Sequence, residues 1–196
     1  APPLSASSTP TASGHSMPQG STLRLGQSPT TLFQADERIS ERYSIRRFIA
    51  RGGMGEVYEA EDLVLGKRVA LKTVRADLVD GEGAEARFRR EISVAREVTD
   101  EHVCRVYDVG FERRPGGQVT FLTMELLDGE TLAARLGREG AMSAETARPL
   151  IAQMTAGLAA AHRMGVIHRD FKSQNVMIVP GDGDARAVIT DFGLAR

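Results

Sequence analysis

The sequence has little of what marks a secreted or membrane-spanning protein. Its 196 residues include one cysteine and no tryptophan. The single cysteine, Cys104, excludes a disulfide framework within the chain and favours a reducing compartment. No apolar run approaches the ~20 residues that a membrane helix needs, and the N-terminal segment does not resemble a signal peptide. We therefore expect a cytoplasmic segment in which Cys104 is a small residue of the core.

An excess of charge of one sign is also lacking. The chain has 25 lysines and arginines against 26 aspartates and glutamates, a net charge of −1. Proteins that bind nucleic acid or anionic membranes usually carry a basic excess, so neither partner is expected. Hydrophobic residues make up 41% of the chain and charged residues 26%, which is typical of a soluble globular protein. The length suits one domain plus a tail.

Residues 1–35 differ in composition from the rest. Five of the eight prolines lie here, separated mostly by serine, threonine and glycine. Such a segment buries too little apolar surface to offset the entropy lost on ordering. The composition therefore predicts a disordered Ser/Thr/Pro-rich tail or linker.

From residue 43 the apolar residues follow the periods of regular secondary structure. Alternation over residues 68–74 is typical of a strand, and a helical period over residues 82–98 indicates a helix. Further strand patterns cover residues 43–49, 56–60, 103–111 and 119–127. The first half is thus predicted to be a sheet of about five strands with one inserted helix, an α+β arrangement.

The second half is predicted to begin with helices. A short helix is expected over residues 131–136, and Ser143 is a suitable N-cap for a long helix ending near residue 162. Pro149 should bend that helix or move its start. The stripe expected to be buried comprises Ile151, Met154, Leu158 and Ala161. Two short strands, residues 176–179 and 187–190, follow.

A glycine-rich loop runs from Ala50 to Val57. Glycines let backbone N–H groups approach phosphate oxygens without a side chain in the way. A dinucleotide fingerprint needs a helix directly after the glycines, whereas here residues 57–60 continue as a strand. A flap over phosphates and a plain hairpin turn both remain open on this motif alone.

Lys72 lies in the middle of an apolar strand. A lysine is rarely buried there unless it has a negative partner, and Glu91 from the following helix could supply one. Such a pair would hold the ammonium group against nucleotide phosphates. The alternative is a lysine at an exposed sheet edge.

A polar loop, His168 to Asn175, lies between two apolar runs. Asp170 and Asn175 are four residues apart, so an acid could meet a substrate hydroxyl while the amide oxygen holds a metal. Lys172 could neutralise a transferring phosphoryl group. A merely solvated loop is the alternative, but buried flanks favour a site. Asp191, directly after a predicted strand, is a second candidate for holding Mg²⁺ with phosphates.

The order of these motifs resembles the protein kinase superfamily over residues 43–196. Within it, Gly-Gly-Met-Gly-Glu-Val-Tyr and Lys172 resemble the bacterial eukaryotic-like serine/threonine kinases. The resemblance implies a two-lobed fold, with an N-lobe and hinge over residues 43–127 and a partial C-lobe over residues 128–196. It also implies ATP and Mg²⁺ as cofactors, protein substrates with Ser/Thr hydroxyls, and autophosphorylation.

The resemblance also implies roles for individual residues. Asp170 would be the catalytic base, Lys172 would assist transfer, and Asn175 and Asp191 would hold Mg²⁺. Lys72, paired with Glu91, would anchor the phosphates. The remaining nucleotide-binding residues fall in three groups: the loop residues Ile49, Ala50, Arg51, Gly52, Gly53, Met54 and Gly55; the gatekeeper Met124 with the hinge Glu125 to Leu127; and the apolar residues around the base, Val57, Ala70 and Met177.

Several residues depart from the family pattern. Ala50 replaces the first loop glycine, which is harmless only if its φ is negative. Phe171 replaces a common leucine, and Ser173 and Gln174 replace a proline and a polar residue. The resemblance stops at Arg196, before the activation segment, so we expect this fragment to be inactive alone. A catalytically inactive nucleotide-binding or scaffolding fragment and a small-molecule phosphotransferase are the alternative functions.

Overall fold

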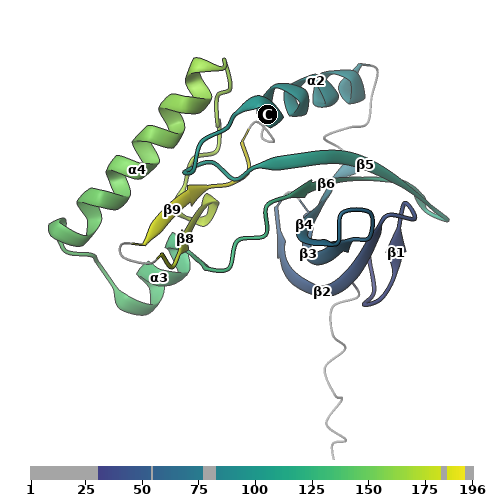
Figure 1. Cartoon of the computed structure of the whole chain (residues 1–196), viewed down its shortest axis with the longest axis horizontal. Coiled ribbons are helices and arrows are strands. Elements are labelled where there is room, and N and C mark those ends of the chain that lie inside the picture. Colours follow the sequence, from purple (N-terminus) through teal and green to yellow (C-terminus); the bar gives the residue numbers. More distant parts are fainter. Residues whose placement is uncertain (1–30, 54, 77–82, 182–184, 193–196) are drawn as a thin grey trace, which may run out of the picture. The chain divides into compact units, whose positions relative to one another are not determined.

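A computed structural model describes residues 31–53, 55–76, 83–181 and 185–192. Its larger sheet has six strands in the order β1-β2-β3-β4-β6-β5, and every neighbouring pair is antiparallel (Figure 1). The strands are β1 (Arg38–Ile39), β2 (Tyr43–Gly52), β3 (Gly55–Asp62), β4 (Lys67–Val74), β5 (Val106–Arg114) and β6 (Gly117–Met124). The five predicted strands are therefore confirmed, and the two-residue β1 is added to them.

The second sheet is smaller and has the order β7-β8-β9. Its strands are β7 (Glu130–Thr131), β8 (Val176–Val179) and β9 (Arg186–Ile189), and the helices are α2 (Ala84–Glu97), α3 (Leu132–Glu139), α4 (Ala144–Arg163) and the 3₁₀ turn η1 (Ser173–Asn175). Helix α2 packs beside β5, whereas α4 packs against β9 and α3 against η1 and β8. Among the described helices, none combines the length and apolar character needed to cross a membrane.

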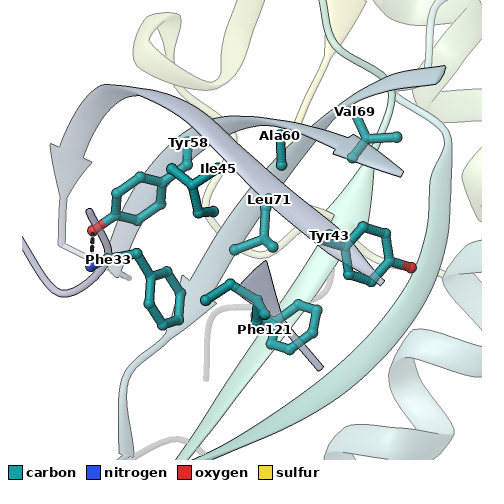
Figure 2. Packing of buried hydrophobic residues seen from close by; sticks show 9 residues of the cluster. Phe33, Tyr43, Ile45, Tyr58, Ala60, Val69, Leu71 and Phe121 are labelled. Atoms are coloured by element: carbon teal, nitrogen blue, oxygen red, sulfur yellow. Dashed lines mark hydrogen bonds between the residues drawn. The ribbon is translucent and has the colours of Figure 1, made fainter. Parts of the chain in front are cut away.

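Two apolar clusters cover opposite faces of the six-stranded sheet, because successive side chains of a strand point to opposite faces. Leu71 belongs to the Phe33 cluster, shown in Figure 2, whose members are Phe33, Ile39, Tyr43, Ile45, Tyr58, Ala60, Val69, Leu71 and Phe121. Its neighbour Ala70 belongs to the Met124 cluster. The buried members of that cluster are Ala70, Val74, Phe88, Ile92, Cys104, Leu122, Met124 and Val188.

Residues 31–35 correct the predicted boundary of the tail. Phe33 is 1% exposed and lies in the core of the sheet (Figure 2), so the ordered chain begins before residue 35. The reason is that the Phe33 side chain packs in an apolar cluster of the sheet, and composition alone does not reveal such a contact. Residues 1–30 lie outside the described residues.

Helix α4 begins where it was predicted to begin. The Ser143 hydroxyl accepts a hydrogen bond from the Thr146 N–H at 3.2 Å, so Pro149 does not move the start of the helix. The predicted stripe is wrong at Ile151, which is 56% exposed. The helix instead buries the adjacent Leu150 together with small residues that permit close packing against β9. The buried positions are Leu150, Gly157, Ala160 and Ala161.

Strand β9 has partners on both of its sides. One side pairs with β8. On the other side, the Gln153 amide of α4 accepts from the Ala187 N–H at 2.6 Å and donates to the Ala185 carbonyl at 3.2 Å. Next to it, the Ile189 N–H donates to the His102 carbonyl and the Ile189 carbonyl accepts from Cys104, both at 2.8 Å. The helix and the 102–104 segment thus complete the sheet.

Gly129 should be intolerant of substitution. A Cβ there would overlap the backbone of Ile178, whereas a Cβ at Gly137 in α3 would meet nothing within 4 Å. We expect Gly129→Ala to destabilise the protein by about 1–3 kcal/mol. The control Gly137→Ala should stabilise it by about 0.5–1 kcal/mol, because alanine is the better helix former. Urea unfolding of both variants checks this, and equal effects would contradict it.

Candidate functional site: a nucleotide cleft and a catalytic loop

The apolar residues predicted to surround a nucleotide base lie together. Antiparallel pairing places Ala70 opposite Met124 and Val57 opposite Lys72. Val57, Leu127 and Met177 pack on the cluster that contains Ala70 and Met124. Since Met177 comes from β8 and the others from the larger sheet and the segment after it, the two sheets share this apolar cluster.

The glycine-rich hairpin joins the end of β2 to the start of β3. The described non-glycine residues with positive φ are Asp36, Ser40, Glu41, Arg169 and Asp191. Ala50 is therefore not left-handed, and its methyl group is compatible with the loop. Gly55 has a φ of 143°, and a Cβ there would overlap Thr73, so this position needs glycine. Ile49 is partly exposed, and the predicted Met54 lies outside the described residues.

Lys72 is held by a carboxylate other than the predicted one. Its ammonium group lies 2.6 Å from Asp191 Oδ1, and the two side chains are 8% and 17% exposed. Glu91 pairs instead with Arg169 of the polar loop, at 3.0 Å. The predicted Lys72–Glu91 pair is therefore absent from the ion pairs of the described residues. The physical reason is that each partner meets a closer opposite charge from the second sheet or its loop.

The polar loop brings its three predicted residues into contact. The Asp170 carboxylate lies 2.6 Å from Lys172 Nζ. The buried Asn175 donates its amide N–H groups to the Asp170 carbonyl at 2.9 Å and to the Asp170 carboxylate at 3.2 Å. The hydrogen bond from Lys172 is the main reason that the pKa of Asp170 is lowered from its ordinary value. Asp170 is consequently ionised at neutral pH and can accept a proton.

His168 connects this loop to the segment that follows β9. It is 3% exposed, and its Nε2 lies 2.9 Å from the Thr190 carbonyl. Its ring packs on Phe192 with centroids 4.7 Å apart. The neighbouring Arg169 has a φ of 65°, and Asp191 a φ of 66°. Such backbone is uncommon for non-glycine residues, and the contacts of His168 help to hold it.

A cation site can be tested against the donors that are present. Asn175 uses its N–H groups on Asp170, so its amide oxygen is the atom suited to a cation. The Asn175 carbonyl accepts from the Thr190 N–H at 2.9 Å, which brings Asp191 next to Asn175. In the described ranges, no group of three or more His, Cys, Asp or Glu side chains could hold a metal. One carboxylate and one amide fit a Mg²⁺ ion whose other ligands are phosphates and water.

The predicted hinge is fixed by the backbone of Arg105 and the side chain of Arg186. The Glu125 N–H donates to the Arg105 carbonyl at 2.9 Å, and the Glu125 carboxylate lies 3.2 Å from Arg186 of β9. Arg186 also donates to the Glu101 carbonyl at 2.9 Å.

A cavity of about 20 Å³ is lined in part by Met124, Cys104 and Phe192. This volume has room for about one water molecule.

Cys104 should be chemically inert in the folded protein. It is buried, and burial raises the pKa of its thiol, so the reactive thiolate is scarce. We expect iodoacetamide at pH 8 to leave Cys104 unmodified in native protein and to label it rapidly in denaturing urea. Mass spectrometry of the Cys104 peptide measures both. Equal labelling in the two conditions would show that the side chain is accessible.

Sequence reasoning missed His168, Arg186 and Glu56 as supporting residues. His168 and Arg186 act through carbonyl groups of distant segments, and pattern offers no signal for such pairs. Glu56 was detectable in principle, because it is an acid within a buried strand. In the structure it accepts hydrogen bonds from Arg51 in the glycine-rich loop.

The fold and the site together define a two-sheet protein with a glycine-rich hairpin on the larger sheet and a polar loop next to β8 of the smaller one. The family model "Protein kinase domain" matches residues 43–196. The chain belongs to the protein kinase family. The fold class and the similarity to bacterial serine/threonine kinases, both predicted from the sequence, are thereby confirmed.

Bacterial serine/threonine kinases are among the most similar proteins. The chain is 39% identical over 163 residues to a probable kinase, PknA2, of Bifidobacterium longum, covering 82% of this chain and 21% of that protein. It is 37% identical over 159 residues to PknA of Mycobacterium tuberculosis, covering 81% and 36%. A solved structure of the M. tuberculosis PknI kinase domain matches with a TM-score of 0.70 and 27% identity, covering 84% of this chain and 64% of that one. The chain thus spans about a fifth to a third of the length of these sequence relatives.

Proposed function

We propose that the complete protein transfers the γ-phosphoryl group of ATP to serine and threonine hydroxyls of proteins, including its own. The observation that carries this proposal is the contact among Asp170, Lys172 and Asn175 in one loop, with Asp191 beside it. These are the groups that phosphoryl transfer requires for proton acceptance, charge neutralisation and metal binding.

Each residue has a role that follows from its chemistry. Asp170, ionised and partly exposed, would accept the proton of the substrate hydroxyl. Lys172 would offset charge on the transferring group. Asn175 and Asp191 would hold Mg²⁺, which when bound neutralises phosphate charge.

In this proposal, nucleotide binding rearranges the ion pairs of the site. Lys72 contacts Asp191 through Oδ1, and a bound Mg²⁺ would compete with Lys72 for this carboxylate. Lys72 would then turn to the nucleotide phosphates and, once Glu91 leaves Arg169, to Glu91. The pairing predicted from the sequence thus belongs, in this proposal, to the nucleotide-bound state.

The lobe boundary is part of the same proposal. Residues 43–127 would form the nucleotide-facing lobe and hinge, and residues 128–196 the first part of the second lobe. Large apolar side chains of the second part are exposed, namely Leu136, Ile151, Met164, Ile167 and Phe171. In this proposal residues 1–196 alone are expected to be inactive.

The test uses the complete protein and labelled ATP. Transfer to serine and threonine in a mixed peptide library, with little transfer to tyrosine, is the expected result. Label on the protein alone measures autophosphorylation. Transfer only to sugars or antibiotics would make the protein a small-molecule phosphotransferase. Nucleotide binding with no transfer to any acceptor would make it the inactive binding module.

A further inference from the structure

The segment ahead of β1 is fastened to the sheet by a single aromatic anchor. We define residues 31–34 as the N-terminal strap. Phe33 packs on Tyr58 with ring centroids 5.4 Å apart (Figure 2). The Arg114 guanidinium lies 4.6 Å from the Phe33 ring centroid. The Phe33 N–H donates to the Tyr58 hydroxyl at 3.1 Å. The strap therefore packs on the sheet at the face of the Phe33 cluster.

The Glu56 carboxylate lies between this strap and the glycine-rich hairpin. One oxygen, Oε2, accepts from the Leu32 N–H at 2.9 Å and from the Tyr58 hydroxyl. The other, Oε1, accepts from Arg51 Nε at 2.9 Å. Oε2 therefore bonds to the strap and to Tyr58, and Oε1 bonds to the glycine-rich hairpin. Burial would raise the pKa of Glu56, but the hydrogen bonds from Tyr58, Leu32 and Arg51 outweigh it and lower the pKa, so the group is charged.

Glu56 lies at the base of the glycine-rich hairpin, where its contacts can fix the shape of the hairpin. Arg51 and Glu56 face each other in the register of β2 and β3, one pair before the closing pair Gly52–Gly55. The Glu56 N–H also donates to Thr73 Oγ1 at 2.9 Å. The base of the flap is therefore fixed to the strap and to β4 at the same point.

This network acts from the face opposite the nucleotide. Glu56 shares its face of β3 with Tyr58 of the Phe33 cluster, whereas Val57 faces the Met124 cluster. Glu56 is thus not placed to touch a nucleotide. Resting on the proposed function, we propose that Glu56 is a positioning residue for ATP: through Arg51 it holds the glycine-rich hairpin in its binding shape, and the N-terminal strap holds Glu56.

Asp62 provides a matched control for loss of a buried carboxylate. It lies on the same face of the same strand, is 2% exposed, and also pairs with an arginine, Arg42, at 2.7 Å. It is six residues from Glu56, or about 20 Å along the strand, at the end away from the flap. Asp62→Asn should cost stability without moving the flap.

The first experiment compares Glu56→Gln with Asp62→Asn in the complete protein. Glu56→Gln should raise the KM for ATP and the Kd of a fluorescent ATP analogue about tenfold, as expected for loss of a hydrogen bond to a charged group. We expect kcat to change less than about twofold, because the catalytic loop is untouched. Asp62→Asn should leave KM within about twofold even where it lowers the melting temperature more. If KM follows the melting temperature equally in both variants, Glu56 is only a structural residue and the inference is wrong.

A second pair of variants tests the strap without altering the carboxylate. Leu32→Pro removes the N–H from which Glu56 accepts, since proline has no backbone donor, and it also fixes φ at this position. Leu32→Ala keeps the N–H and controls for loss of the leucine side chain. Leu32→Pro alone should raise the KM for ATP and speed amide hydrogen exchange in residues 51–56. Equal behaviour of the two Leu32 variants would overturn the role of the strap.

The outcome also separates this inference from the proposed function. A wild-type protein that binds ATP, with Glu56→Gln binding equally well, contradicts only the positioning role. A wild-type protein that does not bind ATP overturns the proposed function and this inference with it.

Discussion

Replacing Asp170 by asparagine should reduce phosphoryl transfer by about 10²–10⁴-fold, the usual contribution of a general base. The affinity for ATP should stay within about threefold, because Asp170 contacts Lys172 and Asn175 and is not part of the Met124 cluster, where we propose that the adenine binds. Asparagine preserves the shape of the side chain, so the loop should retain its fold. Labelled-ATP transfer and calorimetric nucleotide titration measure the two quantities.

A surface variant controls for general effects of removing a carboxylate. Asp108 is 42% exposed, and its contacts with Arg42 and Arg96 are 3.5 Å long. Asp108→Asn should leave transfer unchanged. Activity of Asp170→Asn within a few-fold of the parent would remove Asp170 from the role of base.

The buried pair of Lys72 and Asp191 should show strong coupling in a double-mutant cycle. Lys72→Met or Asp191→Asn leaves one charge without this partner, which costs about 3–5 kcal/mol where a pair is buried. The double variant should be less destabilised than the sum of the singles by about 1–3 kcal/mol. Urea unfolding of the nucleotide-free protein provides all four values, and transfer should be lost in each variant.

Glu91 distinguishes the observed pairing from the one predicted by sequence. Its pair with Arg169 is a third to a half exposed, so Glu91→Gln should cost no more than about 1 kcal/mol without nucleotide. It should also show no coupling with Lys72→Met. A large loss of stability for Glu91→Gln, coupled to Lys72, would mean that Lys72 and Glu91 already pair without nucleotide.

The sequence predicted those elements whose apolar residues recur with a regular period or that begin with a recognisable cap. The alternation around Leu71 predicted β4, and the Ser143 cap predicted the start of α4. The two-residue strands β1 and β7 are too short to show a period, so they were missed. Ile151 was misplaced because a helical period fixes which residues share a face but not where the buried face ends.

The site was predictable in its members but not in its pairings. Asp170, Lys172 and Asn175 lie within one loop, so their proximity follows from the sequence. The partner of Lys72 does not, because the sequence offers both Glu91 and Asp191 as carboxylates and the choice depends on how the second sheet is positioned. The burial of Phe33 could not be predicted for a similar reason. A single aromatic residue in a polar segment gives no periodic signal, and the apolar site in which it packs exists only in the folded sheet.

The double pairing of β9 has a consequence for how the chain avoids association. An exposed strand edge offers N–H and C=O groups on which strands of other molecules can be templated. Here Gln153 and the backbone of residues 102–104 occupy the N–H groups of Ala187 and Ile189 on that edge. The protection comes from two segments earlier in the chain, so it is complete only once both α4 and residues 102–104 have docked on β9. Strand addition at this edge is therefore expected only in the interval during synthesis and folding when β9 has formed and these segments are still detached.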